Sequence, residues 1–255
     1  TARHDMVAAF LADGDARNDL IDTIGRIQDV ARIAGRAAMG RATPRDLAAL
    51  GHSIGQLPAL QERLDLIPAA TSLLASVGDL NDQLGSIGDD IRKRCVDEPP
   101  AHMREGGLFR DGVDEQLDAT RSLQRDGSAW LANYQVELCD STGIPSLKVG
   151  FNRVFGYYIE VTHAHTDRVP NSFVRKQTLK NAERYITDRL KEYEEEATTA
   201  QARGIAREAT LFADLVTNVN RHADALRELS QAVATIDVLC AFAQLAERHR
   251  LVRPN

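Results

Sequence analysis

The sequence is short of cysteine, of net positive charge and of long apolar runs, and each shortage excludes a class of protein. Its three cysteines, Cys95, Cys139 and Cys240, lie far apart with no CxxC pair, which argues against a disulfide framework and a zinc site. Lys and Arg number 31 against 37 Asp and Glu. The formal net charge of -6 therefore excludes a uniformly basic nucleic-acid binder, although not a local basic patch. No apolar run approaches the roughly 18 residues that a membrane span requires. We therefore expect a protein without a membrane span, in a reducing cytoplasm.

Motifs of nucleotide and metal chemistry are also missing. The sequence contains no GxxxxGK[ST] loop, no GxGxxG and no HExxH. His163 and His165 stand two residues apart, but the sequence suggests no third or fourth metal ligand beside them. The acidic run at residues 192–196 is interpreted as a solvated helix face rather than a pair of catalytic carboxylates. We therefore expect that this chain is not an enzyme and holds no metal and no cofactor.

Apolar residues at steps of three and four predict that most of the chain is helical. A stripe within residues 20–38 predicts a first helix, and Thr43 before a proline predicts the start of the next one. Two segments, residues 112–140 and 188–220, predict helices far longer than the average of about 12 residues. A further stripe at residues 226–243 predicts the last helix.

Between the two long helices the apolar period changes to two. Alternation at residues 147–151 and 155–161 predicts two strands, and residues 173–179 and 183–187 predict two more. The expected fold is mainly α, with long antiparallel helices, a helical core and a small antiparallel β-sheet inserted at the helix tips. Three parts are expected: residues 1–140 as helical core and first long helix, 141–187 as the β segment, and 188–255 as second long helix and return to the core.

The β segment, residues 141–187, differs from the rest of the chain in charge. Seven Lys and Arg against three Asp and Glu give it a charge of +4, which leaves -10 for the remainder. A basic end on an acidic support would hold a polyanion through its phosphates without reading sequence. The alternative is that a short exposed sheet is basic in order to protect its edges from aggregation. Arg175 and Lys176 would point to opposite faces of a regular strand, unless a bulge or strand end lets both reach one side.

Two long motifs in this segment closely resemble the clamp domain of the MutS family of DNA mismatch repair proteins. They are KVGFNRVFGYYIEV at residues 148–161 and RKQTLKNAERYIT at residues 175–187. Flanking motifs at residues 39–47, 104–112 and 190–194 resemble the core and lever region of the same family. The resemblance therefore covers essentially the whole chain.

The resemblance implies a clamp that grips double-stranded DNA through its backbone, and lever helices that connect the clamp to a C-terminal ATPase domain. The clamp residues that it places at phosphates are Asn152, Lys176 and Asn181, with Arg153, Arg175 and Gln177 as neighbours. It also implies a homodimer that encircles DNA and moves the clamp with nucleotide state.

The family's mismatch-reading domain, with its Phe-x-Glu motif, and its ATPase domain are missing from the sequence. We therefore expect the middle part of a longer protein, which alone neither recognises a mismatch nor hydrolyses ATP. The parent protein would be a DNA-dependent ATPase that uses ATP and Mg in the missing domain.

Two other functions stay open on the sequence alone. A helical scaffold would bind a protein partner, through a stripe such as that at residues 226–243, and would not bind nucleic acid. A hydrolase would use His163, His165 and nearby acids. A gel-shift titration at two salt concentrations separates the clamp from the scaffold, and metal analysis of the purified chain tests the hydrolase.

Overall fold

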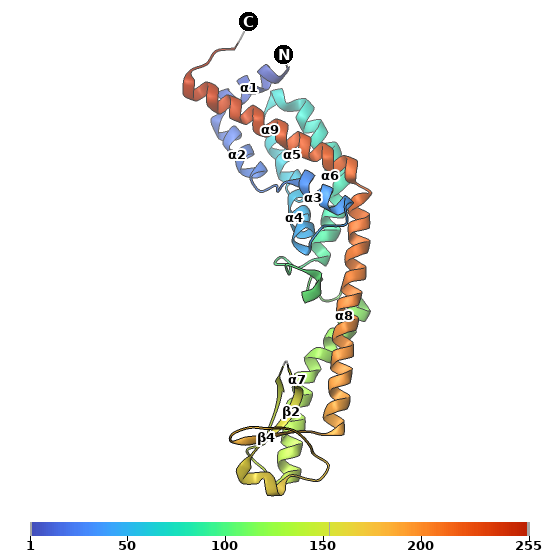
Figure 1. Ribbon diagram of the computed structural model, residues 1–255. Coiled ribbons are helices and arrows are strands. Elements are labelled where there is room, and N and C mark those ends of the chain that lie inside the picture. The colour runs from blue at the N-terminus through green and yellow to red at the C-terminus, as the bar shows by residue number, and fades with distance from the viewer. Residues whose placement is uncertain (1, 153, 254–255) are drawn as a thin grey trace. The chain divides into compact units, whose positions relative to one another are not determined.

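The computed structural model describes residues 2–152 and 154–253, apart from the side chains of residues 123–126. This part of the chain is mainly helical, as expected, with one small antiparallel sheet (Figure 1). The α-helices are α1 (Ala2–Ala12), α2 (Gly14–Ile24), α3 (Val30–Ala38), α4 (Pro44–Ile54), α5 (Leu57–Asp65), α6 (Thr71–Arg94), α7 (Glu115–Thr142), α8 (Asp188–Asn220) and α9 (Ala223–His249). The strands are β1 (Lys148–Asn152), β2 (Gly156–Thr162), β3 (Val174–Thr178) and β4 (Ala182–Ile186). Short 3₁₀ helices are η1 (Pro68–Ala70), η2 (Met103–Glu105) and η3 (His163–Arg168).

The chain forms two compact units. Unit 1 comprises Thr1–Arg110 and Glu208–Asn255, and unit 2 comprises Asp111–Arg207. All four strands lie in unit 2, together with α7 and the N-terminal part of α8. Helix α8 supplies residues to both units, and its bounds are those that the sequence predicts.

Unit 1 is a helical core in which α9 packs against α1, α3 and α6, while α4 and α5 pack against α6. The close contact between α4 and α6 depends on two glycines. A Cβ on Gly51 would come 2.7 Å from Cγ2 of Ile91, and a Cβ on Gly88 would come 2.5 Å from Cγ2 of Ile54. Both distances are too short for real atoms, so larger residues would force the two helices apart.

The single helix expected within residues 20–38 is wrong, because the chain there forms α2 and α3. Helix α2 ends before Gly25, and Asp29 caps α3 by accepting a backbone hydrogen bond of 2.9 Å from the first turn. The predicted start of α4 is confirmed, because Thr43 and Asp46 form a reciprocal capping box. A side chain that satisfies free backbone N–H groups thus sets each of these two starts.

Contrary to the expectation from the sequence, α9 is long and apolar enough to cross a membrane by length and composition. The same test is passed by core helices of proteins outside membranes, and one such helix is weak evidence. In unit 1 the side chains of Leu226, Leu229 and Ile236 are buried against the other helices. The core accounts for the buried side of α9, while Val238, Phe242 and Leu245 of the same helix are exposed.

In unit 2, Asp114 at the start of α7 links this helix to α8. Asp114 caps α7, because its Oδ1 accepts a hydrogen bond of 3.0 Å from the backbone N–H of Leu117. Arg207 of α8 donates two hydrogen bonds to the same carboxylate, over 3.0 Å and 2.6 Å. These hydrogen bonds from Arg207 lower the pKa of Asp114 to about 2. Helix α7 ends at Gly143, whose φ of +66° suits glycine.

Candidate nucleic-acid interface

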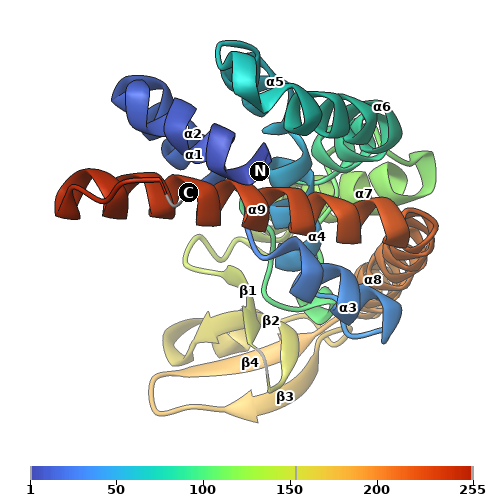
Figure 2. The same cartoon turned by 90° about the horizontal axis from the view of Figure 1, so that it is seen from above.

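The sheet of unit 2 has one face closed by the helices. Its strand order is β1-β2-β4-β3, and every neighbouring pair is antiparallel (Figure 2). Ile159 and Tyr185 are buried together with Tyr134 of α7 and Leu190 of α8. The sheet therefore packs against the C-terminal part of α7 and the N-terminal part of α8, and only its other face and its edges are open to a ligand.

The open face is organised around Arg184 in the middle of β4. Its Nε donates to Glu160 over 3.0 Å, its Nη1 donates to the Gln177 side-chain oxygen over 3.2 Å, and its guanidinium lies 3.9 Å from the ring centroid of Tyr158. Gly150 of β1 leaves room for that ring, because a Cβ there would come 2.9 Å from it. The oxygen of Gln177, a predicted DNA contact, thus binds a protein cation.

Strand β3 contains a bulge that changes the expected geometry of its two cations. Arg175 pairs with Tyr185 and Gln177 pairs with Arg184, which leaves Lys176 as the extra residue. In a regular strand Arg175 and Lys176 would face opposite sides, but a bulge re-aims the side chain of the extra residue. Both residues are exposed on the edge strand of the sheet.

Lys176 reaches from this bulge to the turn between β1 and β2. Its Nζ donates to the backbone oxygen of Phe155 over 3.0 Å and lies 3.9 Å from a carboxylate oxygen of Glu194 on α8. Glu194 is half-buried and lies so close to Gly156 that any side chain at Gly156 would collide with it. The expectation that the acidic run forms a solvated helix face is therefore wrong for Glu194. No local pattern marks it, because its neighbours lie about 20 and 40 residues away in the chain.

Asn152 lies in the same region, at the end of β1. It is half-buried, and its Oδ1 accepts a hydrogen bond of 2.8 Å from the backbone N–H of Val154, which closes the turn. The structure therefore brings Asn152 and Lys176 to one turn, since Lys176 binds Phe155 of that turn. Arg153, also predicted to contact DNA, lies outside the described residues.

Arg175 contacts Glu183 of β4, which also accepts a hydrogen bond from Tyr185. Its Nη1 donates to Glu183 over 3.3 Å, and the hydroxyl of Tyr185 also donates to Glu183. The hydrogen bond from Tyr185, followed by the charge of Arg175, holds the pKa of Glu183 below its usual value. Burial, reinforced by this carboxylate, raises the pKa of Tyr185 to about 12. With 62% of its side chain exposed, Arg175 has the solvent access that a phosphate contact requires.

Asn181 lies at a different place in the sheet, in the turn between β3 and β4. The register puts that turn beside Thr162 at the C-terminal end of β2, whereas Asn152 pairs with Gly156 at the other end. Asn181 is exposed, and its backbone oxygen accepts a hydrogen bond of 3.2 Å from His163. Asn152 and Asn181 therefore lie at opposite ends of β2, while Arg175 and Gln177 lie level with its middle, so the described members of the predicted set do not form one cluster.

The histidines and acids considered for a metal do not gather. His163 binds the backbone oxygen of Leu179 through its Nε2 over 3.0 Å. Within residues 2–152 and 154–253, no three His, Cys, Asp or Glu side chains are close enough to hold a metal ion. The structure therefore gives the hydrolase hypothesis no support.

A series of aromatic rings connects the β1–β2 hairpin to α7 and α8. The ring of Phe151 lies 4.9 Å from that of Tyr157, which lies 5.3 Å from Tyr193 of α8. Tyr193 stacks on Trp130 of α7 at 4.2 Å, and Trp130 stacks on Tyr134 at 4.9 Å. Burial raises the pKa of Tyr193 to about 12. These contacts fix the β1–β2 hairpin to both long helices.

The chain is similar to MutS proteins both by family model and by whole-chain sequence identity. A family model described as MutS family domain IV matches residues 112–203. The DNA mismatch repair protein MutS of Salinibacter ruber is 42% identical over 256 residues, which cover 99% of this chain and 28% of that protein. MutS of Rhodopirellula baltica is also 42% identical, over 100% of this chain and 28% of the relative, and MutS of Methanosarcina acetivorans is 36% identical, over 99% and 28%.

The match to domain IV includes all of α7, all of the sheet and the N-terminal part of α8, and the matches to whole proteins extend it to both units. The chain spans less than a third of the length of these relatives. The chain therefore corresponds to a region of the MutS family of DNA mismatch repair proteins.

Proposed function

We propose that unit 2 grips double-stranded DNA through its phosphates, without reading the base sequence. The observation that carries the proposal is the bulge in β3, at which two consecutive cations, Arg175 and Lys176, are exposed on an edge strand of the sheet. These cations lie in a segment of charge +4 within a chain of charge -6. Exchange of counterions for Lys and Arg contacts is the usual source of such non-specific affinity.

The remaining predicted residues would extend this grip. Asn152 lies beside Lys176 at the β1–β2 turn, and Asn181 lies at the other end of β2. The separation of Asn152 and Asn181 along β2 suits contacts with different phosphates of one backbone. In this proposal Gln177 supports Arg184 instead of binding DNA directly.

The longer protein to which this region corresponds would supply the other activities. We propose that α7 and α8 act as levers that couple the sheet to an ATPase domain outside this chain, which would use ATP and Mg. The parent would act in the cytoplasm as a homodimer around DNA. The division into core, clamp and levers at residues 1–140, 141–187 and 188–255 belongs to this proposal, and the present chain would have no catalytic activity.

The test is a gel-shift titration of an arbitrary 20-base-pair duplex at two salt concentrations, with Arg175→Glu and Lys176→Glu in one chain. We expect this double variant to lose at least about tenfold in affinity at low salt, equally for duplexes of unrelated sequence. The matched control is Lys93→Glu on α6, an exposed cation of unit 1, which should bind as the unaltered chain does.

Lys176→Gln is a necessary companion, because a glutamate at this position would repel Glu194. It should lower the slope of log affinity against log salt by about 1 without changing the fold. Affinity that survives both charge changes at low salt would contradict the proposal.

A second function, that of a helical scaffold, is favoured by one observation. Helix α9 exposes Val238, Phe242 and Leu245, with between 46% and 55% of each residue accessible. If a protein partner binds the chain through Phe242, and the gel-shift titration shows no salt-dependent binding of DNA, the scaffold would be favoured over the clamp.

A further inference from the structure

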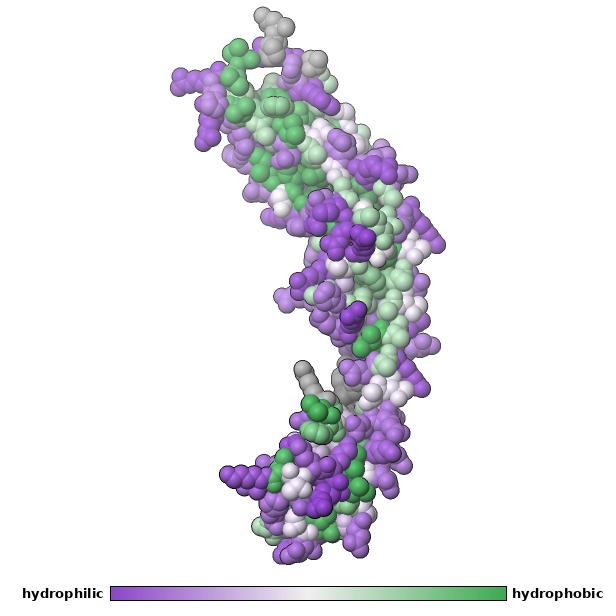
Figure 3. All heavy atoms as spheres, in the orientation of Figure 1, coloured by the Kyte–Doolittle hydropathy of each residue, from purple (hydrophilic) through white to green (hydrophobic). Residues whose placement is uncertain are grey.

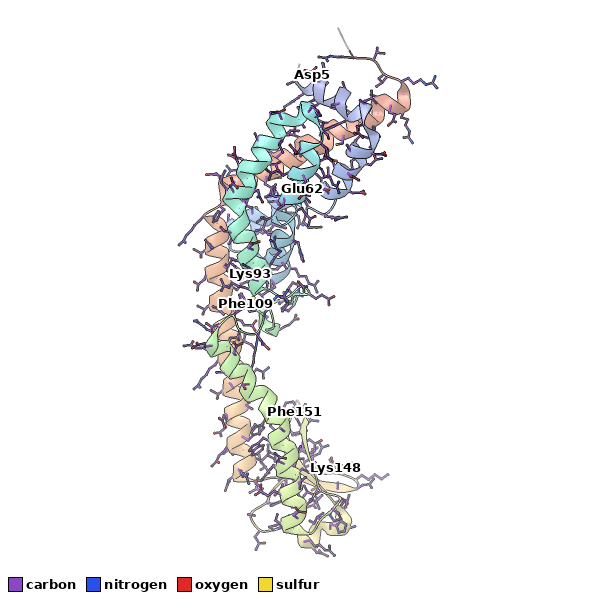
Figure 4. All side chains as sticks on the ribbon, turned by 180° about the vertical axis from the view of Figure 1, so that it is seen from behind. Asp5, Glu62, Lys93, Phe109, Lys148 and Phe151 are labelled. Carbon is purple, nitrogen blue, oxygen red and sulfur yellow. The ribbon has the colours of Figure 1, made fainter. Side chains whose placement is uncertain are left out.

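The turn between β1 and β2 exposes large apolar side chains beside the cations described above. Phe151 is 59% exposed, Val154 80% and Phe155 45%. Figure 3 shows hydrophobic atoms gathered at this turn of unit 2, and Figure 4 shows Phe151 further along β1 than Lys148. Such residues normally enter a core, so their exposure together at one turn indicates a surface that is covered in a complex.

Several contacts involve the described residues on either side of Arg153 in this turn. Asn152 closes it by binding the N–H of Val154, and Gly156 has a φ of +74° that other residues rarely adopt. Lys176 binds the backbone oxygen of Phe155, and Phe151 rests on the ring of Tyr157. Contacts that already restrain apolar side chains reduce the conformational entropy that these side chains lose when they bind.

The chemistry around the turn favours duplex DNA over a second copy of this chain. Lys176 lies beside the apolar side chains, because it binds the backbone oxygen of Phe155, and Glu194 is the acid that faces it. Arg175 precedes Lys176 in β3 and is exposed. In a symmetric contact between two copies the same cations would approach each other, which is unfavourable. The minor groove of DNA instead offers apolar deoxyribose surface between two rows of phosphates, and apolar side chains of other proteins enter it.

We propose that Phe151, Val154 and Phe155 pack against deoxyribose in the minor groove while Lys176 and Arg175 bind the flanking phosphates. The inference deepens the proposed function and rests on it. It adds an apolar component to an affinity that phosphate contacts alone would make wholly dependent on salt.

The test uses the 255-residue chain and an A·T-rich 20-base-pair duplex across a series of salt concentrations. We expect Phe151→Ser with Phe155→Ser to weaken binding about tenfold at every salt concentration and to leave the salt slope unchanged. Val154→Ser alone should weaken binding about threefold, and it serves as the variant least able to disturb the fold, since its side chain is 80% exposed. Phe242→Ser on α9 is the matched control of similar exposure and should change nothing.

A second measurement locates the contact in the groove. Saturation of the duplex with netropsin, a minor-groove ligand, should weaken binding of the unaltered chain and have little effect on the double Phe variant. Equal weakening of both proteins would contradict the minor-groove assignment.

The outcomes separate this inference from the proposed function. If the Phe and Val variants bind like the unaltered chain, the apolar contact is wrong and the phosphate grip stands. If the unaltered chain shows no salt-dependent binding, both are wrong. If the variants change self-association and not DNA affinity, the turn binds a second copy and the inference is overturned.

Discussion

At the scale of residues, Asn152 and Asn181 carry the same amide in different surroundings. Asn152 is half-buried and closes the β1–β2 turn, whereas Asn181 is exposed in the β3–β4 turn. The same substitution therefore has different consequences for stability at the two positions, even if both amides contact phosphate.

We expect Asn152→Ala to lower both stability and DNA affinity, and Asn181→Ala to lower DNA affinity alone. Loss of the turn hydrogen bond of Asn152 should cost about 1 kcal/mol, and loss of either DNA contact should weaken binding about fivefold. Thermal unfolding together with the gel-shift titration checks both values. Equal stability of the two variants would show that the turn does not depend on the Asn152 side chain.

Asp114 gives a pH-dependent prediction, because its pKa in the folded chain is about 2, below the ordinary value of 3.8. A carboxyl group whose pKa is lower in the folded chain than in the unfolded chain stabilises the fold at pH values above the unfolded pKa. This stabilisation is lost as the pH falls toward the folded pKa. Asp114→Asn retains a capping oxygen but removes the ion pair with Arg207, so it should cost about 1 kcal/mol at pH 7.

The difference in stability between the unaltered chain and Asp114→Asn should stay constant down to about pH 5 and disappear between about pH 4 and pH 2. Urea unfolding followed by the fluorescence of Trp130, the one tryptophan of the sequence, measures it in unit 2. A difference that persists at pH 2 would mean that the ion pair is not its source.

Residue-scale features were predictable from sequence where they depend on near neighbours. The start of α4 at Thr43 followed from Thr43 and the proline after it, and the structure confirms it and adds the reciprocal bond with Asp46. The bulge at Lys176 depends on how β3 pairs with β4, and the contact of Glu194 depends on the turn at Gly156 in another element. Neither feature has a local sequence signal. The sequence therefore allows the bulge without predicting it, and it does not predict the contact of Glu194.

At the scale of elements, the contact between α7 and α8 depends on a glycine that faces an aromatic ring. A Cβ on Gly127 would collide with the hydroxyl of Tyr193, and the ring of Tyr193 is held by Trp130 at 4.2 Å and by Tyr157 at 5.3 Å. The ring therefore has little freedom to move aside.

We expect Gly127→Ala to destabilise unit 2 by about 1–2 kcal/mol, although alanine favours a helix by up to about 1 kcal/mol over glycine. Tyr193→Phe removes the colliding hydroxyl, so the double variant should recover part of the loss. Urea unfolding followed by Trp130 fluorescence measures all three variants. A stabilising effect of Gly127→Ala alone would show that the helix preference outweighs the collision.

Elements were predictable where the apolar period was long and unbroken. The bounds of α8 at Asp188–Asn220 agree with the prediction, and four strands appear within a residue or two of the expected places. The stretch at residues 20–38 was mispredicted because its apolar spacing continues across Gly25, while the backbone is set by the cap at Asp29. Capping thus prevailed over periodicity at that point.

At the scale of the whole molecule, the sequence resembles MutS proteins over its full length, while the predicted DNA contacts concentrate in unit 2. Unit 1 has its own helical core, with exposed apolar side chains on α9. DNA contact is therefore proposed for unit 2 alone. The net charge of the whole chain does not predict this division, whereas the local charge of residues 141–187 points to it.

Hydrogen exchange of the 255-residue chain, with and without an arbitrary 20-base-pair duplex at low salt, tests this assignment most directly. We expect the duplex to slow exchange at the turns of the sheet, in residues 152–156 and 179–181, and along β3, and to leave α4, α5 and α9 of unit 1 unchanged. Slower exchange confined to unit 1, or none anywhere while the duplex is bound, would contradict the account.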